Sequence, residues 1–328
     1  MKTSHAVAVS AAIGLGLAVL LVLLLLGGGW WALRAQRSHT PTTATAASAS
    51  ASAAPADAEQ LAAQALAPYR ARLQVTRRPM LQLHLQPMAQ DDRLASKVGG
   101  RPYWTGDKPY PHAADGQPLA LLAQIDLARV PPLPGYPRQG MLQFFIGGDD
   151  FYGANFGDAR SDLDALSEQR NFRVVYWPRL EASARQVQVQ VPLPAADTLP
   201  FDPARPRAMQ FDAGEETIGS SDVRFEQVLG TPLEEIAAAY ASRHAVAQDA
   251  VDDALFDALS RGGHKLGGYP EFTQEDPRTR QDRQVLLLQL DSDEEMMWGD
   301  TGVANFFIDP DDLRRGDFSR VAYHWDCF

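Results

Sequence analysis

Apolar and polar positions alternate along much of the chain in a pattern that predicts strands more often than helices. Apolar residues occupy every second position from Leu81 to Leu85 and from Val187 to Val191, which is the period of a strand with one buried face. Short, almost wholly apolar runs at 172–177 and 286–290 are long enough for buried strands and too short for typical helices. These stretches predict several strands with at least one buried face.

Helical spacing of apolar residues is confined to two regions. It runs from Asp57 to Leu66 and from Leu233 to Leu259, with Leu233, Ile236 and Tyr240 on one face of a predicted helix. No regular alternation of strand and helix, which would predict a parallel sheet, runs along the chain. The pattern therefore predicts an α+β fold with a mostly antiparallel sheet and flanking helices.

Three short blocks of sequence occur twice in the same order. Each copy has a Lys-x-Gly-Gly turn, then an apolar strand ending in Gln-x-Asp, then a glycine followed by an apolar strand ending in Phe-Phe-Ile. The matched ranges are 96–104 with 264–272, 121–127 with 286–292, and 140–146 with 302–308. This order predicts an internal duplication, with one repeat over 80–192 and the other over 231–328, arranged around a pseudo-twofold axis. A solenoid is not predicted, because solenoids need three or more repeats.

These repeated blocks resemble the YwqG-like family of bacterial proteins. The resemblance rests on Lys-Leu-Gly-Gly-Tyr-Pro from Lys265, Leu-Leu-Leu-Gln-Leu-Asp-Ser-Asp from Leu286, and Met-Trp-Gly-Asp-Thr-Gly-Val-Ala-Asn-Phe-Phe-Ile from Met297, together with the earlier blocks. It covers residues 75–328. The resemblance implies an internally duplicated α+β fold and no particular reaction.

The composition of the N-terminal region predicts a membrane anchor followed by a linker. Residues 6–33 carry no charge and are mostly aliphatic, and about 20 apolar residues suffice to span a bilayer. A cleaved signal peptide is the alternative, but its apolar region is shorter. Residues 38–58 are rich in Ala, Ser, Thr and Pro, as in flexible tethers. We therefore predict a tail and single-pass transmembrane anchor over 1–37, a linker over 38–58 and one domain over 59–328.

This anchor predicts a location in the inner or cell membrane, with the membrane itself as one partner through the N-terminal helix. Positive charges flank the apolar segment almost equally on its two sides, so the positive-inside rule hardly decides the orientation. Residues 38–56 of the linker carry no formal charge, which favours a periplasmic or extracytoplasmic domain, and the cytoplasmic side stays an open alternative.

Charge and cysteine content narrow the function classes. The chain of 328 residues has a formal net charge of −11, which argues against a nucleic-acid partner because nucleic-acid binding needs a basic surface. Cys327 is the one cysteine, so neither an internal disulfide framework nor a cysteine-rich metal site can form. No cofactor is predicted.

The acidic stretch from Asp291 to Asp300 raises the question of catalysis or metal binding. Its first carboxylates have the spacing of a calcium loop, but Met296 and Gly302 stand where an EF-hand needs Gly and Glu. No metal ligand and no catalytic residue is therefore predicted. The chain shows no paired base and nucleophile, so a binding or interaction module is favoured over an enzyme. An enzyme or metal-dependent site built on this acidic stretch remains the alternative.

The predicted ligand-binding residues are those of the two Lys-x-Gly-Gly turns and the acidic stretch: Lys97, Lys265, Asp291, Asp293, Trp298 and Asp300. The backbone N–H groups of the turns could bind an anion, and simple turns with exposed lysines are the alternative. The segments 127–140 and 291–302 differ between the repeats, one rich in proline and the other in carboxylates, and are predicted to flank the binding surface. The carboxylates there favour a cationic small molecule or a basic protein segment as partner, and plain surface loops are the alternative.

Overall fold

The computed structural model describes residues 55–106, 108–156, 163–181 and 191–328. These residues belong to one compact unit of the chain, Ser52–Phe328. The predicted anchor and most of the predicted linker lie outside the described residues, as does the predicted strand at 187–191 up to its last residue. The helix predicted from Asp57 is present as α3 (Pro55–Ala65), so the chain becomes helical inside the range predicted as linker.

The prediction of a membrane location is corrected by the helices that the structure describes. The longest of these, α7 (Leu233–His244) and α8 (Gln248–Leu259), have 12 residues each. At about 1.5 Å per residue, each is about 18 Å long, whereas a bilayer core is about 30 Å thick. Among the described residues, no helix is both long enough and apolar enough to cross a membrane.

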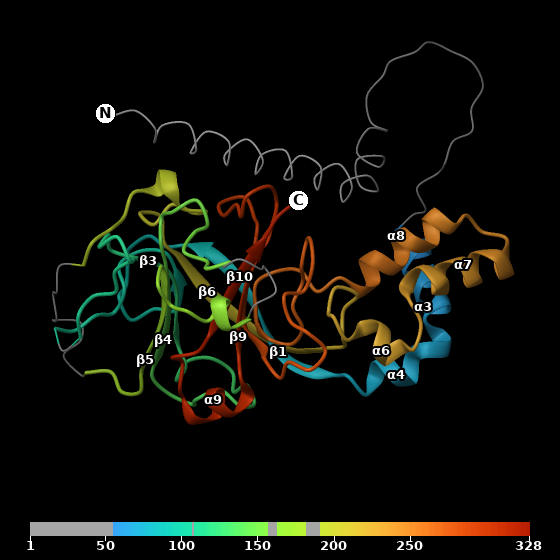
Figure 1. Ribbon diagram of the computed structural model, residues 1–328, viewed down its shortest axis with the longest axis horizontal. Coiled ribbons are helices and arrows are strands. Elements are labelled where there is room, and N and C mark those ends of the chain that lie inside the picture. Colours follow the sequence, from blue (N-terminus) through green and yellow to red (C-terminus); the bar gives the residue numbers. More distant parts are fainter. Residues whose placement is uncertain (1–54, 107, 157–162, 182–190) are drawn as a thin grey trace, which may run out of the picture. The chain divides into compact units, whose positions relative to one another are not determined.

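Within the described residues, ten strands form one antiparallel sheet, which confirms the predicted α+β class. The strands are β1 (Arg78–Pro87), β2 (Lys97–Val98), β3 (Ala120–Asp126), β4 (Met141–Ile146), β5 (Phe172–Trp177), β6 (Arg207–Glu216), β7 (Lys265–Gly267), β8 (Val285–Asp291), β9 (Val303–Ile308) and β10 (Ala322–Asp326). Their order is β10-β9-β8-β7-β1-β6-β2-β3-β4-β5. The long central pair, β1 and β6, is therefore flanked by four strands on each side (Figure 1).

The two flanks of the sheet have the same order and register. Read outward from the centre, β2-β3-β4-β5 corresponds to β7-β8-β9-β10. Lys97 pairs with Gln124 in the first flank, and Lys265 pairs with Gln289 in the second. Each flank also has a register shift at the same place, just after Leu121 in β3 and just after Leu286 in β8.

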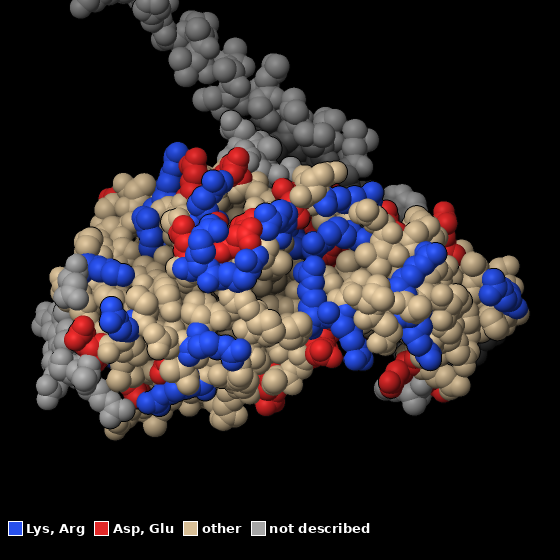
Figure 2. Space-filling view, turned by 90° about the horizontal axis from the view of Figure 1, so that it is seen from below, with Lys and Arg blue, Asp and Glu red and all other residues tan. Residues whose placement is uncertain are grey.

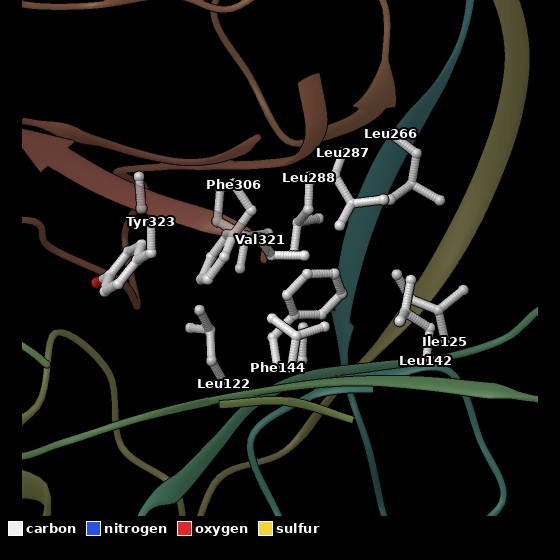
Figure 3. Packing of buried hydrophobic residues seen from close by; sticks show 14 of the residues in the cluster. Leu122, Ile125, Leu142, Phe144, Leu266, Leu287, Leu288, Phe306, Val321 and Tyr323 are labelled. Atoms are coloured by element: carbon white, nitrogen blue, oxygen red, sulfur yellow. The ribbon is translucent and has the colours of Figure 1, made fainter. Parts of the chain in front are cut away.

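The main core lies between the two flanks of the curved sheet. Side chains from β3 and β4 meet side chains from β8, β9 and β10, as Figure 3 shows for the labelled residues. The rings of Phe144 and Phe306 lie 4.9 Å apart, and Phe306 stacks on Tyr323 at 4.5 Å. Burying one such ring contributes about 1.5–3 kcal/mol, so this contact between the flanks holds the sheet in its curved form.

Most helices gather at one side of the sheet around a second apolar cluster (Figure 1). Besides α3, α7 and α8, the helical elements are η1 (Ala67–Tyr69), α4 (Arg70–Gln74), α5 (Leu163–Leu166), η2 (Ala196–Thr198), α6 (Phe225–Leu229) and α9 (Pro310–Arg315). The helices α5 and α9 lie apart from this group, beside the sheet strands. Figure 2 looks onto the side where Figure 1 places α9, and acidic and basic side chains are interspersed there.

Candidate functional site

The lysines of the repeated turns are buried, so the alternative of simple turns with exposed lysines is wrong. Lys97 and Lys265 both have no exposed surface. Lys97 Nζ donates to the carboxylate of Asp91, and Lys265 Nζ lies 3.0 Å from Glu216 Oε1. Burial lowers the pKa of both lysines, while these carboxylates oppose that shift. Each ammonium group is therefore occupied by an internal partner.

The paired glycines hold the same carboxylates against the backbone. All four glycines, Gly99 with Gly100 and Gly267 with Gly268, have positive φ between 69° and 74°. A Cβ at Gly268 would lie 2.1 Å from Glu216 Oε1, so only glycine permits this approach. The N–H of Tyr269 donates to the same oxygen at 2.5 Å. The predicted anion-binding turn exists, but the carboxylate that fills it belongs to the protein.

The two aspartates at the start of the acidic stretch are also engaged internally. Asp293 Oδ2 accepts from Arg207 Nη1 at 2.6 Å and from His264 Nε2 at 2.9 Å. Asp291 Oδ2 accepts from the N–H of Gly263 at 2.6 Å. Partial burial alone would raise the pKa of Asp293, but its hydrogen bonds from His264 and Arg207 hold that pKa well below its usual range. In this setting the Asp293 carboxylate stays ionised, and the positive charge of Arg207 already balances its negative charge.

The ring of His264 connects both aspartates. Its Nδ1 accepts the backbone N–H of Asp291 at 3.0 Å. In a neutral imidazole one nitrogen accepts and the other donates, so this bond places the ring proton on Nε2, facing Asp293. The start of the acidic stretch is therefore fixed to the residue before β7 by one hydrogen bond that the His264 ring accepts and one that it donates.

The six predicted site residues lie in separate environments. Trp298 is fully buried and packs against Tyr152, with ring centroids 5.8 Å apart, whereas Asp300 is exposed. Strands β1 and β6 separate β2, which carries Lys97, from β7, which carries Lys265. The structure brings Asp291 and Asp293 together but does not gather all six residues around one cavity.

A groove lies instead at the proline-rich loop between β3 and β4. Its volume is about 440 Å³. The loop residues that line it are Leu127, Ala128, Val130, Pro131, Pro132, Leu133, Tyr136, Pro137 and Arg138, and strands β1 and β7 contribute Leu81 and Leu266. The groove therefore has walls of mostly apolar side chains, with one guanidinium group.

Two buried side chains fix the loop that forms this groove. Tyr136 Oη donates to the carbonyl oxygen of Leu287 at 2.6 Å, and burial raises the pKa of Tyr136. Leu133 packs so closely on β7 that a Cβ at Gly267 would lie 3.1 Å from Leu133 Cδ2. The loop from the first flank is thus anchored on strands of the second flank, and the proline-stiffened wall is held in one position.

The equivalent place in the other half of the molecule is filled by charged side chains. Leu81 pairs with Leu266, which follows Lys265, and Arg207 pairs with Val98, which follows Lys97. Arg207 therefore takes the place of the groove residue Leu81. Asp293 stands two residues after Asp291, as the groove residue Ala128 stands two after Asp126. Where one half has an apolar groove, the other has the Arg207–Asp293 ion pair.

The sequence identified the loop 127–140 but missed the residues that complete the groove. Leu81 and Leu266 come from strands far away in the chain, and Tyr136 and Arg138 carried no recognised motif. The repeated prolines were the one available signal, because they favour a stiff, fixed loop. Within the described residues, no group of three or more His, Cys, Asp or Glu side chains is placed to hold a metal ion.

Comparison with known proteins shows which family the chain belongs to. No curated protein matches the chain. A family model, described as a domain of unknown function (DUF1963), matches residues 96–327 and so includes both flanks of the sheet. The central strand β1 lies before the matched region, although it pairs with both β6 and β7. Because the match covers more than half of the sequence, the chain belongs to the DUF1963 family.

Proposed function

We propose that this protein is a binding module for a small molecule with an apolar body and one anionic group, held in the groove at loop 127–138. The groove itself is the observation that carries this proposal. Its volume of about 440 Å³ is within the range of about 300–1,000 Å³ for small-molecule sites. Such sites are mostly apolar with a few polar groups that orient the ligand, which matches the lining described above.

Arg138 supplies the charge preference in this proposal. Its side chain belongs to an exposed residue that lines the groove. Among the described residues, no carboxylate forms an ion pair with Arg138, whereas many other arginines have such partners. A guanidinium binds a carboxylate, sulfonate or phosphate group through two parallel hydrogen bonds. An anionic group at the edge of the groove would therefore be favoured over a cation.

The cationic ligand expected from the sequence is less well supported in this groove. That expectation relied on free carboxylates at Asp291 and Asp293, and both accept hydrogen bonds from the protein. The enzyme alternative would need a carboxylate of raised pKa as an acid or base, and the pKa of Asp293 is lowered. These contacts favour binding over catalysis as the proposed role.

We also propose that the two halves arose by internal duplication and then diverged at the groove. The repeated blocks, the equal strand order of the two flanks and the matched register shifts support this origin. On this proposal, the shared residues maintain the fold in both halves. Function was added where the halves differ, with the apolar groove in one and the Arg207–Asp293 pair in the other.

A pair of fluorescent probes tests the binding proposal. Anilinonaphthalene sulfonate has an apolar body and one anionic group, and N-phenylnaphthylamine has a similar body without the charge. We expect the full-length protein to bind the sulfonate probe, and Ala128→Trp to weaken binding at least about tenfold because the indole fills the groove. Ala204→Trp is the matched control, since Ala204 is also exposed and lies outside the groove.

The charge preference is tested by Arg138→Gln. This variant is expected to weaken binding of the sulfonate probe while leaving binding of N-phenylnaphthylamine unchanged. If Ala128→Trp is folded by circular dichroism and binds the sulfonate probe as tightly as the wild-type protein does, the groove is not the binding site. Equal effects of Arg138→Gln on both probes would overturn the anionic preference alone.

A further inference from the structure

Three segments of the chain that contact one another each carry an exposed aromatic or apolar side chain. Phe151 is 55% exposed, Met297 48% and Phe328 68%, and Trp325 is half-buried beside them. We call these four residues the aromatic patch. None of them lines the groove at loop 127–138, so the patch is a second surface.

Contacts between the segments hold the patch together. Trp325 Nε1 donates to the carbonyl oxygen of Phe151 at 2.7 Å, and the N–H of Phe328 donates to the carbonyl oxygen of Asp300 at 3.2 Å. A Cβ at Gly299 would lie 3.1 Å from the Trp325 ring. The segments around 151, 299 and 325 therefore lie in direct contact.

The patch rests on a rigid aromatic base. Tyr152 packs against Trp325 with ring centroids 4.9 Å apart and against Trp298 at 5.8 Å. Trp298 is fully buried, so the exposed rings stand on side chains that do not move freely. A surface that is already ordered loses less conformational entropy when a partner binds.

The three segments that carry the patch are acidic. The segments 147–152, 292–302 and 322–328 contain no Lys and no Arg. Asp150, Glu294 and Asp300 are exposed there, whereas Glu295 is paired with Arg205 at 2.8 Å. An apolar centre with an acidic edge is the arrangement expected at an interface, where aromatic residues supply affinity and charges at the edge guide the approach of the partner.

We propose that the aromatic patch is a docking surface for a protein segment that carries both basic and apolar side chains. The basic residues meet Asp150, Glu294 and Asp300, and the apolar residues cover Phe151 and Met297. A second copy of this chain is disfavoured as the occupant, because two copies of the same acidic edge repel each other in a chain of net charge −11. The phosphates of a nucleic acid would be repelled in the same way.

Model peptides test this surface on the full-length protein. The probe is a fluorescein-labelled peptide of alternating Lys and Leu, compared with peptides of Glu and Leu and of Lys and Ser, and binding is measured by fluorescence anisotropy. We expect the Lys–Leu peptide to bind most tightly, and its affinity to fall as added salt screens the charges. Neither comparison peptide should match it, since each lacks one of the two features that the patch recognises.

Matched variants locate the binding. Phe151→Ser is compared with Phe256→Ser, because both rings are 55% exposed and Phe256 lies on α8, outside the patch. Phe151→Ser should weaken binding of the Lys–Leu peptide about tenfold, and Phe256→Ser should leave it within about twofold.

Charge variants provide the second comparison. The set Asp150→Asn, Glu294→Gln and Asp300→Asn should weaken binding about tenfold, whereas the set Glu59→Gln, Glu234→Gln and Asp257→Asn on the helices should have little effect. Both sets remove three exposed carboxylates, so they change the net charge equally. The proposal is overturned if the Lys–Leu peptide does not bind, or if the Glu–Leu peptide binds as tightly as the Lys–Leu peptide. It is also overturned if the patch variants and the control variants lose the same affinity.

Discussion

Gln124 and Gln289 make the same three hydrogen bonds in the two halves of the molecule. Each fully buried side-chain amide donates to two backbone carbonyl oxygens and accepts one backbone N–H. The partners are Arg93, Ala95 and Tyr103 for Gln124, and Arg261, Gly263 and Glu271 for Gln289. Each partner of Gln289 lies 168 positions after the equivalent partner of Gln124 (261 − 93, 263 − 95 and 271 − 103). One buried glutamine thus holds each Lys-x-Gly-Gly turn to its sheet flank.

Replacing either glutamine should destabilise the protein by a similar amount. Gln124→Leu and Gln289→Leu each remove the amide partner of three partly or fully buried backbone groups, although the Arg261 carbonyl oxygen still accepts from Lys265 Nζ. One unsatisfied buried group costs about 1–3 kcal/mol. We expect the free energy of unfolding to fall by about 3 kcal/mol or more in each variant. Urea denaturation measures this, with exposed Gln210→Leu as the control. A large loss in one variant and none in the other would contradict the equivalence of the two glutamines.

Gly140 and Gly302 should tolerate no side chain, because each lies against the backbone of an edge strand. A Cβ at Gly140 would lie 2.3 Å from the Trp177 carbonyl oxygen, and one at Gly302 would lie 1.8 Å from the Asp326 carbonyl oxygen. We expect Gly140→Ala and Gly302→Ala each to lower the melting temperature by several degrees or more, as overpacking costs about 1–3 kcal/mol. Gly106→Ala, with open space around its Cβ, should change it little. Unchanged melting of both variants would refute this.

The Arg207–Asp293 pair should show unequal effects when its members are replaced singly. The Arg207 side chain is 8% exposed and that of Asp293 is 27% exposed. Asp293→Leu therefore leaves the more deeply buried charge, that of Arg207, with only its 3.7 Å contact to Glu295, and an uncompensated buried charge costs up to about 3–5 kcal/mol. We expect Asp293→Leu to lower the free energy of unfolding more, and the double variant to recover much of the loss. Additive losses in the double variant would be inconsistent with this explanation.

Asp222 should make stability depend on pH below about pH 4. It is buried between Arg224 and Arg278, at 2.7 Å and 2.9 Å. Burial alone would raise the pKa of Asp222, but the two arginines lower that pKa from 3.8 to about 2. The ionised carboxylate therefore favours the folded state. Its contribution of about 2 kcal/mol is complete above the unfolded pKa and is lost as the pH falls towards the folded pKa.

Urea denaturation of wild type and Asp222→Asn at several pH values checks this contribution. The difference in free energy of unfolding between the two proteins should shrink by about 1 kcal/mol between about pH 6 and pH 3. The asparagine does not titrate, so its own stability reports the remaining groups. A difference that stays constant over this range would show that Asp222 is not held ionised by its arginines.

Local patterns predicted β1, β5, β8 and β9, because alternation and short apolar runs reflect which face of a strand is buried, but they did not predict β6 or β10. The blocks around Gln124 and Gln289 also predicted which segments would correspond. The burial of Lys97 and Lys265 could not be predicted in this way, because it depends on Asp91 and Glu216. These carboxylates lie outside the repeated blocks and reach the turns only in the folded chain.

The candidate site was harder to predict for a similar reason. The proline-rich loop was visible in the sequence, but its groove needs Leu81 and Leu266 from two other strands. The acidic stretch was visible too, but a sequence does not show that Arg207 neutralises Asp293 or that His264 donates a hydrogen bond to it. Long-range pairing across the sheet decides both outcomes.

On the proposed function, one half of the molecule binds a ligand at a place where the other half holds an ion pair. Methyl NMR of the full-length protein, labelled at Leu and Val and titrated with anilinonaphthalene sulfonate, tests it most directly. We predict that the methyl signals of Leu127, Val130 and Leu133 shift together, while the signal of Val98, beside Arg207, does not. Unchanged groove signals, or an equal shift at Val98, would contradict the claim.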